Sequence, residues 1–189
     1  MNMTLYKGAY RIESARLAVW DYRQPGWYFA TLCAKGSQPY FGFIRDGKMC
    51  LSQAGEIAEH ELRSVPLHYN AVSLDSHIVM PNHVHAVVCI DGIHAHSPEG
   101  AIEEWRIKLE SDSRHLPSLG SIIGGYKSAV ARKCHAVGIA SFAWQARFYD
   151  HIIRGNHAVA AVREYIRNNP QNWDRGSGDD HPDWNLLLA

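Results

Sequence analysis

Apolar residues gather in short stretches that end at turn-forming residues, a pattern typical of β-strands. A continuous run of β-branched and aromatic residues at 27–34 follows the turn signal Pro25-Gly26 and predicts a buried strand. Two further runs, 71–80 and 83–90, are separated only by Pro81-Asn82. This separation predicts an antiparallel hairpin.

Between and after these strands, apolar residues recur at the three- and four-residue spacing of helices. Residues 52–63 open with a serine that can cap a helix, and Pro66 follows them. Residues 118–137 open with Ser118 and carry one apolar stripe. The stripe consists of Leu119, Ile122, Ile123, Tyr126, Val130 and Cys134. A last helix is predicted at 157–167, before the sequence Asn168-Asn169-Pro170.

A fourth strand, predicted at 148–154, completes an order that identifies a fold class. Strand, helix, strand, strand, helix, strand, helix is the ferredoxin-like or split βαβ plan. We therefore predict an α+β protein whose antiparallel sheet has four to five strands, with helices packed on one face. Residues 91–117 read as a long connection with a short helix near 102–109. We expect one domain at 1–175 and a C-terminal tail at 176–189.

Composition is that of a soluble globular protein. Of the 189 residues, 46% are hydrophobic and 20% are charged. No apolar run approaches the roughly 18 residues of a spanning helix, and the first ten residues lack the apolar stretch of a signal peptide. We expect a cytoplasmic protein with no membrane partner. The four cysteines show no C-x-x-C spacing, which argues against a zinc knuckle or a redox motif.

The formal net charge is zero, yet basic residues are concentrated in the second half. Residues 118–175 contain eight Lys or Arg and three Asp or Glu, a net charge of +5. The preceding 117 residues contain 11 basic and 13 acidic side chains. If the chain binds a polyanion, its second half carries the contacts. The alternative is an ordinary solvated surface.

The segment at 83–90 is the most informative for chemistry. Alternate residues of a strand share a face, so His83 and His85 project side by side and can hold one divalent ion. The same spacing at His94 and His96 lies among Gly, Ser and Pro, where nothing fixes both side chains on one face. Taken alone, an H-x-H pair is a weak signal.

Two residues of the preceding strand lie near this pair in the predicted hairpin. His77 is either a partner of the metal ligands or a satisfied strand histidine. Asp75, expected on the same face as His77, is a candidate carboxylate ligand.

Four ordered blocks, spread over residues 27 to 173, resemble the REP-associated tyrosine transposases of the single-tyrosine HUH superfamily. The blocks are VMPNHVH at 79–85, SLGSIIGGYKS at 118–128, WQARFYDHIIR at 144–154 and YIRNNP at 165–170. The resemblance implies a ferredoxin-like fold, a divalent metal (Mg²⁺ or Mn²⁺) held by His83 and His85, and a helix-borne tyrosine nucleophile, which we assign to Tyr126. It also implies REP-like single-stranded DNA hairpins as the substrate. Related transposases often act as dimers, but no interface stripe stands out.

The function implied is that of a single-stranded DNA endonuclease and strand transferase with a 5′-phosphotyrosine intermediate. Candidate DNA contacts are Lys127, Arg132, Arg147 and Arg154. Two other readings stay open: a hairpin-binding protein of the same fold without catalytic activity, and a metal-dependent hydrolase of a small phosphate ester.

The spacing of Tyr126 on the apolar stripe is also that of a core aromatic, with Tyr149 and Tyr165 as the other candidate nucleophiles. The glycine pair at 124–125, before Tyr126, favours close approach of the backbone to something else. Related enzymes often place a further polar metal ligand one helical turn after the tyrosine, where this chain has Val130. The remaining ligand is therefore left open among His135, Asp75, His151 and water.

Overall fold

The computed structural model describes residues 20–91 and 116–173. The short helix expected near 102–109, the H-x-H at 94–96 and the tail at 176–189 lie outside these residues. Within the described ranges the elements follow the expected order, with one additional two-stranded ribbon.

Four antiparallel strands form the central sheet in the order β4-β5-β1-β6. They are β1 (Gly26–Cys33), β4 (Val72–Val79), β5 (His83–Ile90) and β6 (Tyr149–Ile153). Strand β5 lies between β1 and β4, so the two strands joined by the first helical connection are not neighbours, as the split βαβ plan requires. The ferredoxin-like α+β prediction is confirmed.

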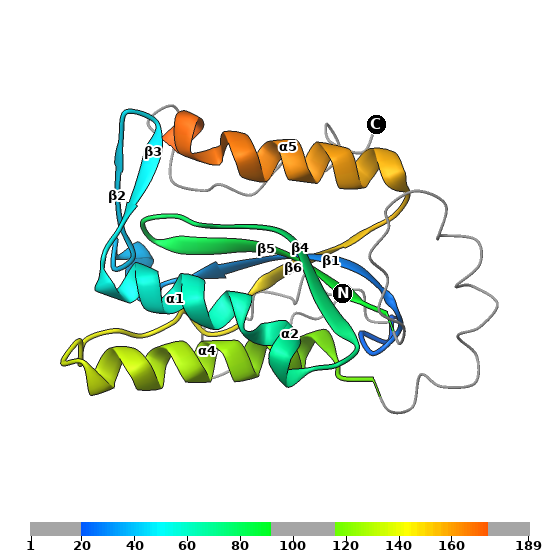
Figure 1. Ribbon diagram of the computed structural model, residues 1–189, viewed down its shortest axis with the longest axis horizontal. Coiled ribbons are helices and arrows are strands. Elements are labelled where there is room, and N and C mark those ends of the chain that lie inside the picture. The colour runs from blue at the N-terminus through cyan, green and yellow to red at the C-terminus, as the bar shows by residue number, and fades with distance from the viewer. Residues whose placement is uncertain (1–19, 92–115, 174–189) are drawn as a thin grey trace, which may run out of the picture.

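Helices α1 (Gln53–Arg63) and α4 (Leu119–Ala136) begin where their capping serines predict. The hydroxyl of Ser52 accepts a hydrogen bond from the amide of Gly55, and that of Ser118 accepts one from Ser121. Both helices cover the same face of the sheet, with the short α2 (Val65–His68) beside them (Figure 1). The large hydrophobic core lies here, between these helices and the sheet.

Helix α5 (Asn156–Asn172) covers the opposite face, which corrects the expectation that the helices pack on one face. Both crossover helices of a split βαβ unit fall on one side because the connections share a hand. Helix α5 follows the last strand and is free to cover the side that remains. It also continues through Pro170, where we expected it to end. Among the described helices, none is long and apolar enough to cross a bilayer.

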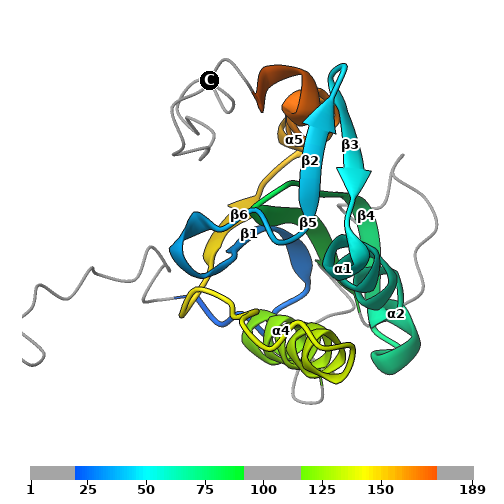
Figure 2. The same ribbon diagram turned by 90° about the vertical axis from the view of Figure 1, so that its left-hand side faces the viewer.

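The chain between β1 and α1, expected to be a plain connection, forms a two-stranded ribbon after a short 3-10 turn, η1 (Lys35–Ser37). Its strands are β2 (Gly42–Arg45) and β3 (Lys48–Leu51). Asp46 and Gly47 join them with positive φ angles of 52° and 69°, as a tight hairpin turn requires. The ribbon stands at one end of the sheet and reaches from α1 towards α5 (Figure 2).

Candidate active site

Strand β5 delivers its two histidines to the face covered by α5. Val84 and Ala86 point into the main core, so the alternating His83 and His85 point the other way, as the sequence predicts. The side chains are almost fully covered: His83 is 4% exposed and His85 is 0% exposed. Buried imidazoles need polar partners, and both have them.

The two rings face each other through their Nε2 atoms, which lie 2.9 Å apart. On the far side of each ring, the Nδ1 atom meets an oxygen: His83 bonds to Asn82 Oδ1 at 2.7 Å, and His85 bonds to Thr31 Oγ1 at 3.0 Å. An amide oxygen only accepts, so Nδ1 of His83 carries the proton and Nε2 of the neutral ring presents a lone pair. The two Nε2 atoms therefore need either a shared proton or a cation between them.

This arrangement fits a divalent ion. The separation of 2.9 Å between the two Nε2 atoms is that of a hydrogen bond between the rings. Two imidazole nitrogens that face each other from same-face positions of one strand can also bind one divalent ion, as zinc is bound at roughly 2.0–2.1 Å. Oxygen partners on both Nδ1 atoms are also what metal-binding histidines use to fix the tautomer and the ring orientation. From the sequence, Asn82 was expected only as a turn residue and Thr31 only as part of a strand, although a polar residue such as Thr31 in an apolar strand is a visible signal.

Tyr165 of α5 is the tyrosine that meets this pair. Its hydroxyl lies 3.4 Å from Nε2 of His85, and the two ring centroids are 5.3 Å apart. Phe29 packs against both rings, stacked on His85 at 5.2 Å and edge-on to Tyr165 at 6.1 Å. The phenol and the imidazoles therefore lie together between β5 and α5. From its sequence, Tyr165 was expected only as an alternative nucleophile to Tyr126.

Three residues at successive turns of α5 lie along the histidine pair. Tyr165 contacts His85, and eight residues later the Trp173 ring lies 6.0 Å from the His83 ring. Asn169 is one turn after Tyr165 and one turn before Trp173, so it lies on the same helix face between them. This asparagine is only 6% exposed. In the sequence, Asn169 could have been recognised as a polar residue four positions after Tyr165, within the block 165–170.

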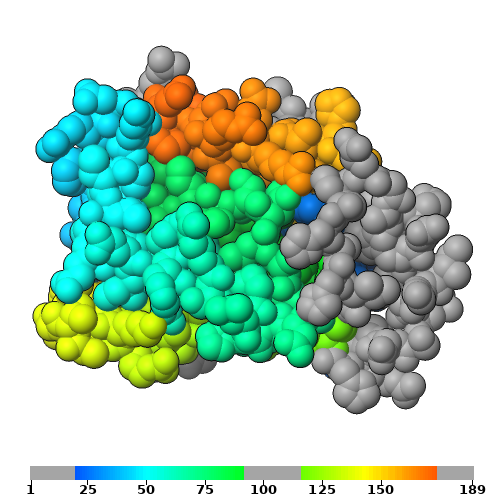
Figure 3. Space-filling model, in the orientation of Figure 1, coloured from blue at the N-terminus to red at the C-terminus, as the bar shows by residue number. Residues whose placement is uncertain are grey.

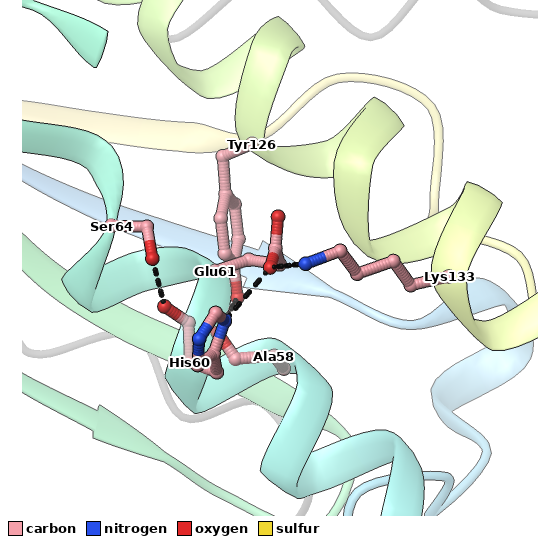
Figure 4. A network of polar contacts seen from close by, with 6 residues as sticks. All are labelled: Ala58, His60, Glu61, Ser64, Tyr126 and Lys133. Carbon is pink, nitrogen blue, oxygen red and sulfur yellow. Dashed lines mark hydrogen bonds and ion pairs between the residues drawn. The ribbon is translucent and has the colours of Figure 1, made fainter. Parts of the chain in front are cut away.

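We expected Tyr126 to lie beside the histidine pair. Instead, it lies on the other side of the sheet. The ring is 3% exposed in the main core, and its hydroxyl donates to the carbonyl of Ala58 in α1 at 3.1 Å (Figure 4). Burial raises the pKa of this phenol well above its ordinary value. Tyr126 therefore behaves as the core aromatic that its spacing also allows.

The neighbours of Tyr126 complete a structural contact between α1 and α4. Glu61, 7% exposed, pairs with Lys133 and with the His60 ring (Figure 4). Burial raises the pKa of the Glu61 carboxyl, but its two cationic partners outweigh that effect and leave the pKa below its ordinary value. Gly125 has a helix-packing role, because a Cβ there would lie 2.8 Å from the hydroxyl of Tyr69.

None of the side chains considered as a further metal ligand joins the pair. A β-bulge between Leu74 and His77 puts Asp75 and His77 on opposite faces, where we expected them on the same face. Asp75 is bound by Arg163 of α5, with Nε to Oδ2 at 2.8 Å, and His77 bonds to Glu59 of α1 at 3.2 Å.

The other candidates are also placed elsewhere. His135 of α4 bonds to the Phe142 carbonyl at 2.8 Å on the main-core side. His151 shares the α5 face but lies on β6, with β1 between it and β5. Val130 is 0% exposed in the main core, so it has no bearing on the histidine pair. Within 20–91 and 116–173, no three His, Cys, Asp or Glu side chains gather as a metal site would require.

The four predicted DNA contacts are dispersed. Lys127 donates to the carbonyls of Gln145 and Arg147 at 2.7 and 2.9 Å, so its ammonium holds the loop before β6. Arg132 is exposed on α4, on the far side of the sheet from His83 and His85. Arg147 is exposed with a positive φ of 70°, and its loop joins the end of β1 that pairs with His83.

Arg154, the fourth of these residues, is exposed and lies over the Trp20 ring at 5.6 Å. It follows β6 and precedes α5, far along α5 from the residues that contact the histidines. The structure therefore does not gather the four basic residues around His83 and His85.

Comparison with known proteins supports the fold. No family model matches the chain. An uncharacterised protein of Haemophilus influenzae (strain Rd) is 29% identical over 174 residues, covering 89% of this chain and 93% of that protein. The structure of a REP-associated tyrosine transposase bound to a REP hairpin aligns with a TM-score of 0.50 at 18% identity, covering 84% of this chain and 74% of that one. The chain thus has a transposase-like fold.

Proposed function

We propose that the protein is a metal-dependent nuclease and strand transferase of single-stranded DNA that uses Tyr165 as its nucleophile. The observation that carries the proposal is the meeting of three groups from two elements: the facing Nε2 atoms of His83 and His85, and the Tyr165 hydroxyl 3.4 Å from one of them. A core polar cluster needs no such convergence of two imidazoles and a phenol.

The chemistry suits these groups. Mg²⁺ or Mn²⁺ bound at the imidazole pair would supply positive charge to the phosphate and to the leaving oxygen. The Tyr165 oxygen forms a bond to phosphorus, the bond from phosphorus to the 3′ oxygen breaks, and that oxygen takes up a proton. The products are a 5′-phosphotyrosine and a free 3′-hydroxyl. Because one phosphoester replaces another, the reverse step can rejoin strands without an external energy source.

Asn169 is the proposed additional ligand. Its place one turn after Tyr165 is the position where the resemblance to single-tyrosine transposases leads us to expect a polar side chain, and an amide oxygen suits Mg²⁺ or Mn²⁺. Val130 argued against catalysis only because it follows Tyr126 by one helical turn, where a polar ligand was expected. With Tyr165 as the nucleophile, that objection no longer applies. The side chains over the histidines, Trp173 among them, must shift before a phosphate reaches a pair that is 4% and 0% exposed.

The proposed substrate is a folded single strand, such as the REP hairpin bound in the structure of similar fold. Arg147 and Arg154 remain proposed DNA contacts because both are exposed. A homodimer and a cytoplasmic location also remain proposals.

The test is incubation of a labelled single-stranded hairpin with the full chain and Mn²⁺, followed by denaturing electrophoresis for a covalent adduct. Tyr165→Phe should reduce adduct formation by at least about 10³-fold, because the attacking oxygen is gone. The matched control is Tyr126→Phe, which also removes one phenol oxygen but on the other face. It should leave the adduct rate within about threefold and lower the free energy of unfolding by about 0.5–1.5 kcal/mol.

A second candidate is a hairpin-binding protein without cleavage activity. It is favoured by the absence, among the described residues, of a third acidic, histidine or cysteine side chain beside the imidazoles. The same experiment separates the two functions: binding with no adduct in the unchanged protein supports this candidate. An adduct that survives Tyr165→Phe and disappears with Tyr126→Phe would refute our assignment of the nucleophile.

A further inference from the structure

The β2-β3 ribbon presents a face that the proposed reaction does not use. In the ribbon register Phe43 pairs with Cys50 and Arg45 pairs with Lys48, so these four side chains share one side. Ile44 and Met49 share the other side, where Met49 packs against the main core. We call the first side the outer face of the ribbon.

Three of the side chains on the outer face are exposed, and their chemistry is mixed. Phe43 is 52% exposed, the Arg45 guanidinium carbon lies 5.2 Å from the centroid of its ring, and Lys48 is also exposed. The one acidic residue of the ribbon, Asp46, is in the turn. An accessible aromatic ring beside two cations, which are paired with each other nearer the turn, matches the two parts of an unpaired nucleotide, a flat base and a charged phosphate.

The ribbon is built to hold this face in place. A Cβ on Gly42 would lie 2.0 Å from the Cys50 carbonyl oxygen, so the strands come together more closely than any larger residue permits. At the base, Ser52 bonds through its hydroxyl to the Tyr40 carbonyl at 2.5 Å and through its amide to the Phe41 carbonyl at 2.8 Å.

The base of the ribbon is hydrogen-bonded next to the histidine pair, and its tip lies close to the C-terminal end of α5. At the base, the Phe41 amide donates to the carbonyl of Pro81, two residues before His83, at 3.0 Å. At the tip, a Cβ on Gly47 would lie 3.5 Å from the Gln171 side chain, two residues before Trp173. Trp173 is the residue whose ring lies beside His83. Figure 3 shows the ribbon projecting from the surface next to the C-terminal part of α5.

We propose that the outer face of the ribbon, through Phe43, Arg45 and Lys48, binds unpaired nucleotides of the DNA strand that enters the site at His83. The proposal rests on the proposed function for the identity of the strand. Phe43 stacks on a base, and the two cations, which lie together on the turn side of Phe43, contact the neighbouring phosphate backbone. A nucleotide stacked there extends the grip of the protein beyond the scissile phosphate and favours hairpins that carry a single-stranded flank.

The test compares three labelled DNA probes by fluorescence anisotropy in EDTA, where no cleavage takes place. One is a blunt hairpin, and the other two are the same hairpin with about twelve thymidines on its 5′ side or on its 3′ side, within the roughly 4–16 nucleotides that a stacking groove covers. The unchanged protein should bind one of the extended probes more tightly than the blunt hairpin.

Phe43→Ala should weaken binding of that extended probe by about 5- to 100-fold, the usual range for one stacked base, and leave the blunt hairpin unchanged. Phe43→Trp should retain the affinity. Lys48→Ala should reduce the slope of log affinity against log salt by about 0.7, as for one lost single-strand phosphate contact. The matched control is Leu67→Ala, because Leu67 is 81% exposed on α2 and should change neither probe.

The proposal is overturned if the single-stranded flank adds no affinity, or if Phe43→Ala weakens binding of the blunt and the extended hairpin equally. It is also overturned if the protein binds a flank of RNA, made of uridines, more tightly than the flank of thymidines. It is also overturned if Phe43→Ala turns a dimer into a monomer in sedimentation without altering DNA affinity, since the ribbon would then join two copies of the chain. Failure of the adduct experiment with a positive flank result removes the proposed reaction and leaves the ribbon as a DNA-binding face.

Discussion

The two faces of the central sheet differ in what they bury. Under α1 and α4 lies a large apolar core, in which Tyr126 is locked to a backbone carbonyl. Under α5 lies a smaller cluster that surrounds two imidazoles and a phenol. Burying polar groups costs free energy unless they are paired, so the second face holds a paired polar cluster where the first face has apolar packing. The phenol of Tyr126 satisfies the backbone, whereas that of Tyr165 is directed at a pair of nitrogens.

Truncating one buried isoleucine to alanine on each face of the sheet should give the largest difference in adduct formation between the two faces. Ile122→Ala on the α4 side and Ile166→Ala on the α5 side each remove a side chain that is at most 2% exposed. Each should lower the free energy of unfolding in urea by about 2–5 kcal/mol. Ile166→Ala, next to Tyr165, should also slow adduct formation, while Ile122→Ala should not. Equal adduct rates in the two variants, measured well below their unfolding midpoints, would remove the functional distinction between the faces.

A smaller effect is expected from the support of His85. Thr31→Val keeps the shape of a side chain that is 3% exposed but removes the oxygen 3.0 Å from the imidazole. Loss of such a partner typically weakens metal affinity about 10–100-fold, which titration with Mn²⁺ followed by electron paramagnetic resonance can measure. Thr31→Ser retains the hydroxyl and should stay within about threefold. If Thr31→Val binds Mn²⁺ as well as the unchanged protein, the histidine pair is not the metal site.

The smallest effect belongs to the main-core face and depends on pH. Because the pKa of Glu61 is lowered in the folded protein, its charge stabilises the fold above the ordinary value of 4.5. That contribution disappears as the pH falls through the lowered pKa. Glu61→Gln should therefore cost about 1 kcal/mol of unfolding free energy at pH 7, and the difference should begin to shrink below pH 4.5, the ordinary pKa, and shrink further as the pH falls through the lowered pKa. A difference that grows as the pH falls below 4.5, or any loss of adduct formation at pH 7, would contradict a purely structural role.

The sequence was sufficient for the sheet and for the histidine pair because both depend on local patterns. Alternation along β5 fixes which side chains share a face, and the turn at Pro81-Asn82 fixes the hairpin register. The β2-β3 ribbon was missed although Asp46-Gly47 between two short apolar runs is a strong hairpin signal.

The nucleophile could not be chosen from spacing. A tyrosine on an apolar helical stripe has the same pattern whether the stripe faces a core or a site, and the pattern does not say which side of the sheet the helix covers. Tyr126 and Tyr165 differ in that respect, and also in the residue four positions later, which is Val130 after Tyr126 and Asn169 after Tyr165. The separation of Asp75 from His77 was equally hidden, because a bulge of one residue leaves no mark in the hydrophobic pattern.

That bulge has a consequence for the edge of the sheet. Strand β4 is the outermost strand on its side, and edge strands are the parts of a sheet most prone to separate from it or to pair with another chain. Here Asp75 ties the strand to α5 through Arg163, while His77 ties it to α1 through Glu59. To open this edge, the protein has to break contacts with α5 and with α1 together. A single extra residue in β4 therefore lets helices on both faces of the sheet hold the same edge strand.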